Sequence, residues 1–182
     1  MKPEKIIVNT FVLRPIPKTW EYAQQIFDAF SKDKDGFNFW MRGQSYQTVT
    51  DVYMAYQKKY QDEKDWGYAM YGIFLGDELL GEIGLSGIDV RNRTAEIGYW
   101  LRPESRGQGI VNLLIPVIED LGFNTLDLRK LYIWCDVKNF ASVRRAQNNH
   151  YVLEGVLRER QVWPDGSIHS TAIFGKLKSE HH

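Results

Sequence analysis

The sequence predicts a mixed α/β fold in one domain, with a mostly antiparallel sheet and flanking helices. Segments rich in β-branched and aromatic residues are interspersed with amphipathic helical stripes, but not in the regular order of a doubly wound sheet. Of the 182 residues 43% are hydrophobic, which is enough for one sizeable core. Neither a linker nor a repeat divides the chain. We therefore expect one domain over residues 1–178 and a tail over 179–182, whose His181-His182 resembles an expression-tag remnant.

The first half is predicted to hold one strand, two helices and three further strands. Residues 11–14 form a strand that Pro15 and Pro17 end. Two helical stripes follow, over 20–30 and 46–60, each with one apolar face. The three further strands cover residues 68–75, 79–86 and 94–101.

The second half is predicted to begin with the clearest helix, over 109–121, which is apolar at every i, i+3, i+4 position. Pro116 removes one hydrogen bond of that helix and should kink it. A strand over 131–137, a helix over 141–149 and a hairpin of strands 152–163 and 167–178 complete the fold.

Composition excludes several kinds of partner. The 23 basic and 23 acidic residues balance, so no excess of charge points to nucleic acid or to an anionic membrane. No apolar run approaches the roughly 20 residues of a membrane helix. The single cysteine, Cys135, predicts a core residue and a reducing cytoplasm. Because His150 and His169 fit neither a serine-histidine-acid order nor a metal spacing, no metal site is predicted.

The most informative segment runs from a strand through Arg106-Gly107-Gln108-Gly109 into the helix. The N-terminus of a helix presents unpaired N–H groups and a partial positive charge, and glycines let a ligand approach the backbone closely. The loop therefore predicts a phosphate site. It is neither a Walker loop nor a dinucleotide fingerprint, since Gly-Lys-Ser/Thr and GxGxxG are both absent from it.

Here the chain resembles the GNAT acetyltransferase superfamily. Arg106-x-x-Gly109-x-Val111 is similar to its Gln/Arg-x-x-Gly-x-Gly/Ala pyrophosphate loop and departs from it at Val111. Further blocks resemble the ribosomal-protein N-terminal acetyltransferases of the RimJ/RimL type, at residues 11–14, 95–100, 136–142 and 151–155. The resemblance implies a sheet splayed at a cofactor cleft, acetyl-CoA as co-substrate, an amine acceptor such as a protein N-terminus, and a homodimer.

The resemblance also implies roles for individual residues. Backbone N–H groups of residues 108–112 would hold the CoA pyrophosphate, and the strand end at 99–101 would pair with the pantetheine arm. Asn139 would hydrogen-bond that arm and Ser142 would protonate the departing thiolate. Ala146 stands where many members carry a tyrosine, so that acid is not available from this position. The cofactor candidates are Tyr99, Trp100, Leu101, Arg106, Gly107, Gln108, Gly109, Ile110, Val111, Asn112 and Asn139.

Two glutamates are candidate bases for the attacking amine, because each lies in an otherwise apolar strand where burial would raise its pKa. These are Glu82 and Glu96, and we favour Glu96 because it leads directly into the cofactor strand. Strand alternation places Glu96, Gly98 and Trp100 on one face of the strand. The other face holds Ala95, Ile97, Tyr99 and Leu101. A backbone N–H near Tyr99 would bind the oxyanion.

The acceptor stays open at this point. An α-amine has a pKa of about 8 and a lysine one of about 10.4, so using lysine costs roughly 3 kcal/mol more at pH 7. This favours an N-terminal acceptor. Small amines such as polyamines are the alternative, with the acids of residues 62, 63 and 65 as their recognition site. A CoA-binding module without turnover is a second alternative, kept open by Ala146 and Val111. The apolar cluster at 37–41 is expected in the core, with the acceptor site as its alternative location.

Overall fold

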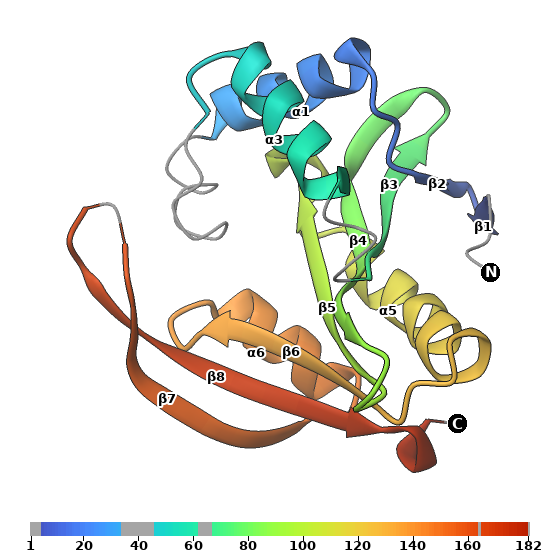
Figure 1. Ribbon diagram of the computed structural model, residues 1–182, viewed down its shortest axis with the longest axis vertical. Helices are drawn as coiled ribbons and strands as arrows, with labels where there is room; N and C mark the ends of the chain where they lie inside the picture. Colours follow the sequence, from blue (N-terminus) through green and yellow to red (C-terminus); the bar gives the residue numbers. More distant parts are fainter. Residues whose placement is uncertain (1–4, 34–45, 62–66, 164, 182) are drawn as a thin grey trace.

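An eight-stranded sheet forms the centre of the computed structural model, which describes residues 5–33, 46–61, 67–163 and 165–181 (Figure 1). The strands stand in the order β1-β2-β3-β4-β5-β6-β8-β7, and each neighbouring pair is antiparallel except β5–β6. Their bounds are Ile6–Val8, Phe11–Pro15, Ala69–Leu75, Glu78–Asp89, Thr94–Leu101, Lys130–Asp136, Val152–Val162 and Ile168–Leu177, for β1 to β8. The prediction of a mixed, mostly antiparallel α/β fold is confirmed.

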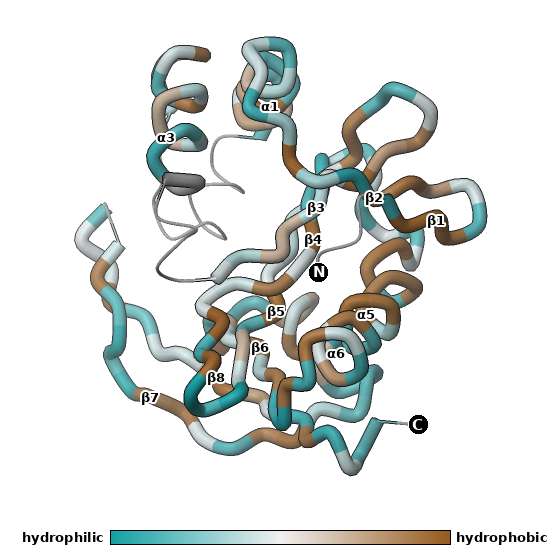
Figure 2. Tube along the Cα trace, turned by 45° about the vertical axis from the view of Figure 1, so that its right-hand side comes forward, coloured by the Kyte–Doolittle hydropathy of each residue, from teal (hydrophilic) through white to brown (hydrophobic). Residues whose placement is uncertain are grey.

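The helices cover opposite faces of this sheet. Helices α1 (Trp20–Lys32) and α3 (Val49–Gln61) pack on one face through Tyr22 and Tyr56 and lie together at one end of the sheet (Figure 1). Helices α5 (Ile110–Asp120) and α6 (Phe140–Asn148) bury their apolar faces on the other side, in the larger core cluster. The hydrophobic colour of nearly all of α5 agrees with this burial (Figure 2).

The sheet splays between its two parallel strands. Pairing of β5 with β6 covers Thr94–Glu96 against Lys130–Tyr132 and goes no further. Strand β5 nevertheless continues to Leu101 and β6 to Asp136, so the two strands diverge toward their carboxyl ends. This divergence is the splay that the family resemblance implied.

Several boundaries differ from the sequence predictions. Strand β1 was not predicted, because three residues are too short for a periodic signal; Asn9, at φ 54°, forms the turn that pairs it with β2. Strand β2 includes Pro15 at its end. Helix α3 starts only after Tyr46, because Thr48 and Asp51 exchange hydrogen bonds that cap it. The apolar cluster at 37–41 and the acids at 62, 63 and 65 lie outside the described residues.

The C-terminal segment packs on the domain. After β8 a short 3₁₀ turn covers Lys178–Glu180. The ring centroid of His181 then lies 5.1 Å from that of Phe123, in the π-helical turn Leu121–Thr125, and its Nδ1 lies 3.3 Å from Glu119 Oε2. His181 of the predicted tail is thus in contact with the core.

Candidate active site

A cleft of about 650 Å³ opens where β5 and β6 diverge. Residues 96–101 of β5 and 133–136 of β6 form two of its walls. The loop before α5, the first turn of α6 and the β7–β8 hairpin supply the rest, including Arg106, Asn139 and Trp163. The site is therefore built where strands end and helices begin, which is where open α/β sheets usually bind ligands.

The loop before α5 has the geometry of an anion site. Gly107 and Gly109 adopt φ of 77° and 76°, a region that favours glycine, and Gly109 is the N-cap of α5. Two donors of the Arg106 side chain are already engaged within the protein, one by Leu101 O at 3.1 Å and one by Asp33 Oδ2 at 2.6 Å. What the loop offers an anion is therefore its backbone N–H groups and the helix dipole.

The predicted cofactor residues fall into two groups. Seven of them line the cleft: Tyr99, Trp100, Leu101, Arg106, Gly107, Val111 and Asn139. The other four, Gln108, Gly109, Ile110 and Asn112, belong to the loop and first turn of α5 without appearing among the cleft-lining residues. Val111 is 2% exposed and packs in the core. The residue that departs from the family motif therefore fills the protein interior.

Ser142 and Asn139 are joined at the start of α6. Asn139 is the N-cap, and its Oδ1 accepts the Ser142 N–H at 3.0 Å. The Ser142 Oγ lies 2.6 Å from the hydroxyl of Tyr99 on β5. Burial raises the pKa of the neighbouring Cys135 thiol to about 11, although a Ser142 hydrogen bond acts in the opposite direction. Cys135 is thus a buried, protonated thiol, as the sequence predicted, but it also lines the cleft.

Glu82 is enclosed by three hydrogen-bond donors on the α1–α3 face. The hydroxyls of Tyr22 and Tyr56 donate to its Oε1 at 2.7 and 2.9 Å, and Trp100 Nε1 donates to its Oε2 at 3.0 Å. Its side chain is 1% exposed, and it is not among the residues that line the cleft. The carboxylate therefore ties both N-terminal helices to the sheet.

Glu96 lies at the last β5–β6 pair and lines the cleft. Strand alternation places it on the same face as Trp100, whereas Tyr99, Ile97 and Leu101 belong to the α5 and α6 side, as predicted. The cleft thus joins two faces of the sheet, with Ser142 on one and Glu96 on the other.

The sequence did not reveal a hydrogen-bonded chain around His169. His169 Nδ1 lies 2.6 Å from Asp136 Oδ2 and its Nε2 lies 2.7 Å from Ser167 Oγ, while its ring stacks on Trp163 at 3.6 Å. His169 is a buried residue, and no spacing in the sequence indicated this chain, because the fold brings together β6 and the hairpin. Ser167 Oγ donates to Asp165 at 2.6 Å, so the chain links the hairpin tip to the cleft wall.

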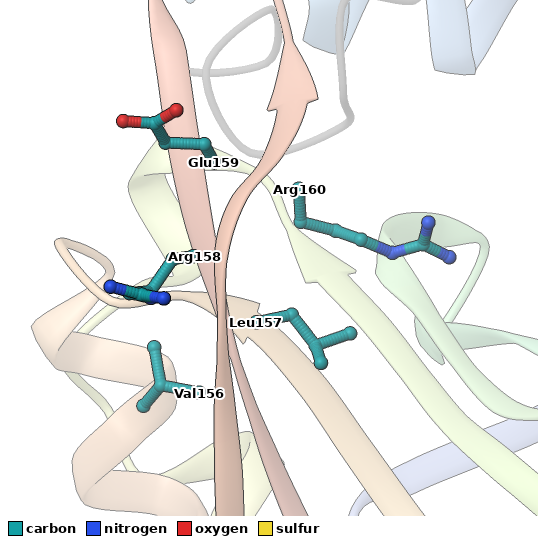
Figure 3. A pocket seen from close by; sticks show the side chains of 5 residues that line it. All are labelled: Val156, Leu157, Arg158, Glu159 and Arg160. Atoms are coloured by element: carbon teal, nitrogen blue, oxygen red, sulfur yellow. The ribbon is translucent and has the colours of Figure 1, made fainter.

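A second hollow of about 690 Å³ lies along β7 and is lined by residues 156–160. Figure 3 shows Leu157 and Arg160 on one side of the strand and Val156, Arg158 and Glu159 on the other. This irregular alternation arises at a bulge, where Glu159 adopts φ 51° and the β7–β8 register shifts. Since one strand supplies all its lining residues, this hollow offers a ligand a single wall.

No group of three metal-ligating side chains occurs in the described ranges, and none of the described helices is long and apolar enough to cross a membrane.

Comparison with known proteins places this geometry in a family. The acetyltransferase (GNAT) domain matches residues 10–152. The ribosomal-protein-serine acetyltransferase of Escherichia coli K12 is 39% identical over 100 residues, which span 54% of this chain and 56% of that protein. The uncharacterized N-acetyltransferase YoaA of Bacillus subtilis is 28% identical over 93% of this chain and 94% of its own length.

A solved structure has the same fold. RimL, a ribosomal L7/L12 α-N-protein acetyltransferase in complex with CoA disulfide-linked to a cysteine, superposes with a TM-score of 0.87 at 24% identity, covering 97% of this chain and 99% of that one. Together with the domain match and the cleft between the splayed strands, this similarity shows that the chain belongs to the GNAT acetyltransferase family.

Proposed function

We propose that this protein transfers the acetyl group of acetyl-CoA to an amine, by direct attack when both substrates are bound. The observation that carries the proposal is the cleft between β5 and β6, which ends at the glycine loop before α5. An extended thioester with a pyrophosphate at one end fits these two features. The backbone of β5 beyond its last pair with β6 suits the pantetheine arm, and the helix N-terminus suits the pyrophosphate.

The proposed acid and the proposed base lie on opposite faces of the sheet. Ser142, on the α6 side, delivers a proton to the departing sulfur. Glu96, on the opposite face, accepts the proton of the attacking amine, directly or through water. We favour Glu96 over Glu82 because Glu96 lines the cleft, whereas both oxygens of Glu82 already accept hydrogen bonds. A backbone N–H of β5 near Tyr99 binds the oxyanion.

The acceptor we propose is the α-amine of a protein N-terminus. The name of the E. coli relative, a ribosomal-protein-serine acetyltransferase, supports a protein acceptor. The larger neutral fraction of an α-amine at pH 7, roughly 0.1 against 0.0004 for lysine, favours the N-terminus. The single cysteine fits a reaction in the reducing cytoplasm.

We further propose a homodimer that uses β7. This strand stands at the end of the sheet, so one of its edges has no neighbouring strand among the described residues. It also exposes apolar side chains, of which Val152 is 57% and Leu153 52% exposed. An exposed apolar edge strand is a ready surface for pairing with a second copy.

A thiol-release assay with three acceptors tests the proposal. The acceptors are a peptide with a free N-terminus and no lysine, an N-terminally blocked peptide with one lysine, and spermidine. We expect turnover with the first peptide and little with the second. Turnover with spermidine alone would establish the small-amine alternative. Binding of acetyl-CoA without release of thiol in a broad panel of amines would establish a CoA-binding module.

A further inference from the structure

Two hydroxyls and a guanidinium lie in series along the α6 side of the cleft. The Tyr99 hydroxyl lies 2.6 Å from Ser142 Oγ, and both side chains line the cleft. Arg145, three residues after Ser142 on α6, has its guanidinium carbon 5.7 Å from the centre of the Tyr99 ring. The Asn139 cap fixes the backbone of Ser142. The three side chains therefore adjoin one another in the order arginine, tyrosine, serine, and all three line the cleft.

The hydrogen-bonding capacity of these groups gives the series a direction. The guanidinium of Arg145 lies over the Tyr99 ring and has no acceptor atom, so it cannot take the Tyr99 proton. The single phenolic proton is then available to Ser142 Oγ, and the proton of Ser142 is directed to a further acceptor. Cys135 beside Ser142 supplies no thiolate for this purpose, because burial raises its pKa to about 11. The remaining direction is the cleft.

Serine by itself is a poor acid for this reaction. If it protonated a thiolate alone it would be left as an alkoxide, which is far more basic than a thiolate. A phenol, with an ordinary pKa of about 10 against about 8.5 for a thiol, makes the proton transfer far less unfavourable than a serine alone does. Burial raises the pKa of Tyr99, with hydrogen bonding to Ser142 and the charge of Arg145 opposing this, so the phenol holds its proton in the resting enzyme.

We propose that Tyr99 supplies the proton that Ser142 passes to the departing sulfur; this rests on the proposed function, and specifically on Ser142 as the acid. As the N–C bond forms and the C–S bond breaks, the sulfur electron pair takes the Ser142 proton and Ser142 Oγ takes the Tyr99 proton. The phenolate faces Arg145 and regains a proton from water. Tyr99 acts through Ser142 and is therefore a positioning and proton-supplying residue.

This arrangement provides a phenol although α6 has no tyrosine at the position where the family resemblance would place one. The helix carries Ala146 where the family resemblance would place a tyrosine, and Ala146 is fully buried. Tyr99 packs against the same core cluster from β5. The phenol that α6 lacks is thus provided from the neighbouring strand.

Four variants test the relay: Tyr99→Phe, Ser142→Ala, the double variant, and Tyr53→Phe as a matched control whose ring contacts Trp20 on the helical layer. We expect Ser142→Ala to lower kcat by about 10²-fold or more and Tyr99→Phe by about 10-fold or more, with the affinity for acetyl-CoA changed only a few-fold. Because Tyr99 acts only through Ser142 in the relay, the double variant should be no slower than Ser142→Ala. The control should match the parent.

A second readout needs no acceptor. When unacetylated CoA is bound in the cleft and the pH is raised, the ultraviolet absorbance of its thiolate measures the ionisation of the CoA thiol. Loss of a donor should raise the pKa of the bound thiol, more in Ser142→Ala than in Tyr99→Phe, and not in Tyr53→Phe.

The outcomes separate the two proposals. A Tyr99→Phe variant that matches the parent in kcat and in the thiol titration would overturn the relay and leave the role of Ser142 intact. A Ser142→Ala variant that matches the parent in both would remove the proposed acid and the relay together. Strictly additive losses in the double variant would show that the two hydroxyls act independently, and would also overturn the relay.

Discussion

The substitution Glu82→Gln should lower the stability of the fold and leave the acetylation rate within a few-fold of the parent. The carboxylate of Glu82 accepts three hydrogen bonds, two from tyrosine hydroxyls and one from the Trp100 indole. The indole only donates, so the amide oxygen of glutamine must face Trp100 and its NH₂ must face the tyrosines. Neutral hydrogen bonds then replace charge-assisted ones, and each replacement lowers the stability of the fold by about 1 kcal/mol. Part of this loss is offset because the variant no longer buries a charge.

The expected net loss is about 1–3 kcal/mol, and for a chain of this length each kcal/mol lowers Tm by about 2–4 °C. Urea unfolding and thermal melts measure it, with Glu96→Gln as the matched control. That second variant should stay within about 0.5 kcal/mol of the parent in stability, because Glu96 is half-exposed, but should lower kcat by about 10²-fold or more. If Glu82→Gln abolishes turnover at full stability, Glu82 is the base and the assignment made here is wrong.

Three further predictions test the cofactor site and the assembly. Gly109→Asp puts a carboxylate at the anion site, on a backbone whose φ of 76° is strained for any residue with a side chain. The affinity for acetyl-CoA, measured by calorimetry, should therefore fall by at least about 10-fold. An unchanged affinity would show that the pyrophosphate binds elsewhere. Oxidised CoA should form a mixed disulfide with Cys135, which mass spectrometry detects as added mass, and the reaction should speed up as pH rises toward the Cys135 pKa of about 11, because only the thiolate reacts. Cys135→Ser should abolish the adduct. Failure to label the parent would show that the thiol end of CoA lies away from Cys135. Val152→Lys should convert a dimer to a species of 21.3 kDa in sedimentation, whereas a parent that already sediments at that mass would refute the dimer.

The parts of the site that could be predicted from sequence depend on local patterns. Strand β5, the glycine loop and α5 lie close together in the chain, and their periodicity and glycine spacing are strong, so their order was predicted correctly. The Asn139–Ser142 cap is likewise a local motif, which spans four residues. Such features depend little on the rest of the fold.

What could not be predicted depends on residues far apart in the chain. The hydrogen-bond partners of Glu82 include Tyr22 and Tyr56, which lie 60 and 26 positions away. A single glutamate in an apolar strand was therefore compatible with a catalytic base or with a buried structural hydrogen-bond acceptor. Asp136 meets His169 across 33 positions, only because β6 pairs with β8. Tyr99 meets Ser142 across 43 positions. In each case the sequence contains the residues, but their pairing follows from the topology.

The short parallel ladder between β5 and β6 also has a consequence for cooperativity. It joins a five-stranded part, β1 to β5, to a three-stranded part, β6, β8 and β7, through the pairs that end at Glu96 and Tyr132. Opening this ladder would break few hydrogen bonds of either part, so amide hydrogens on the two sides should exchange as separate units. A ligand lying between the strands would bridge the two parts. Slowed exchange along both β5 and β6 would then report occupancy of the cleft before any acetyl group is transferred.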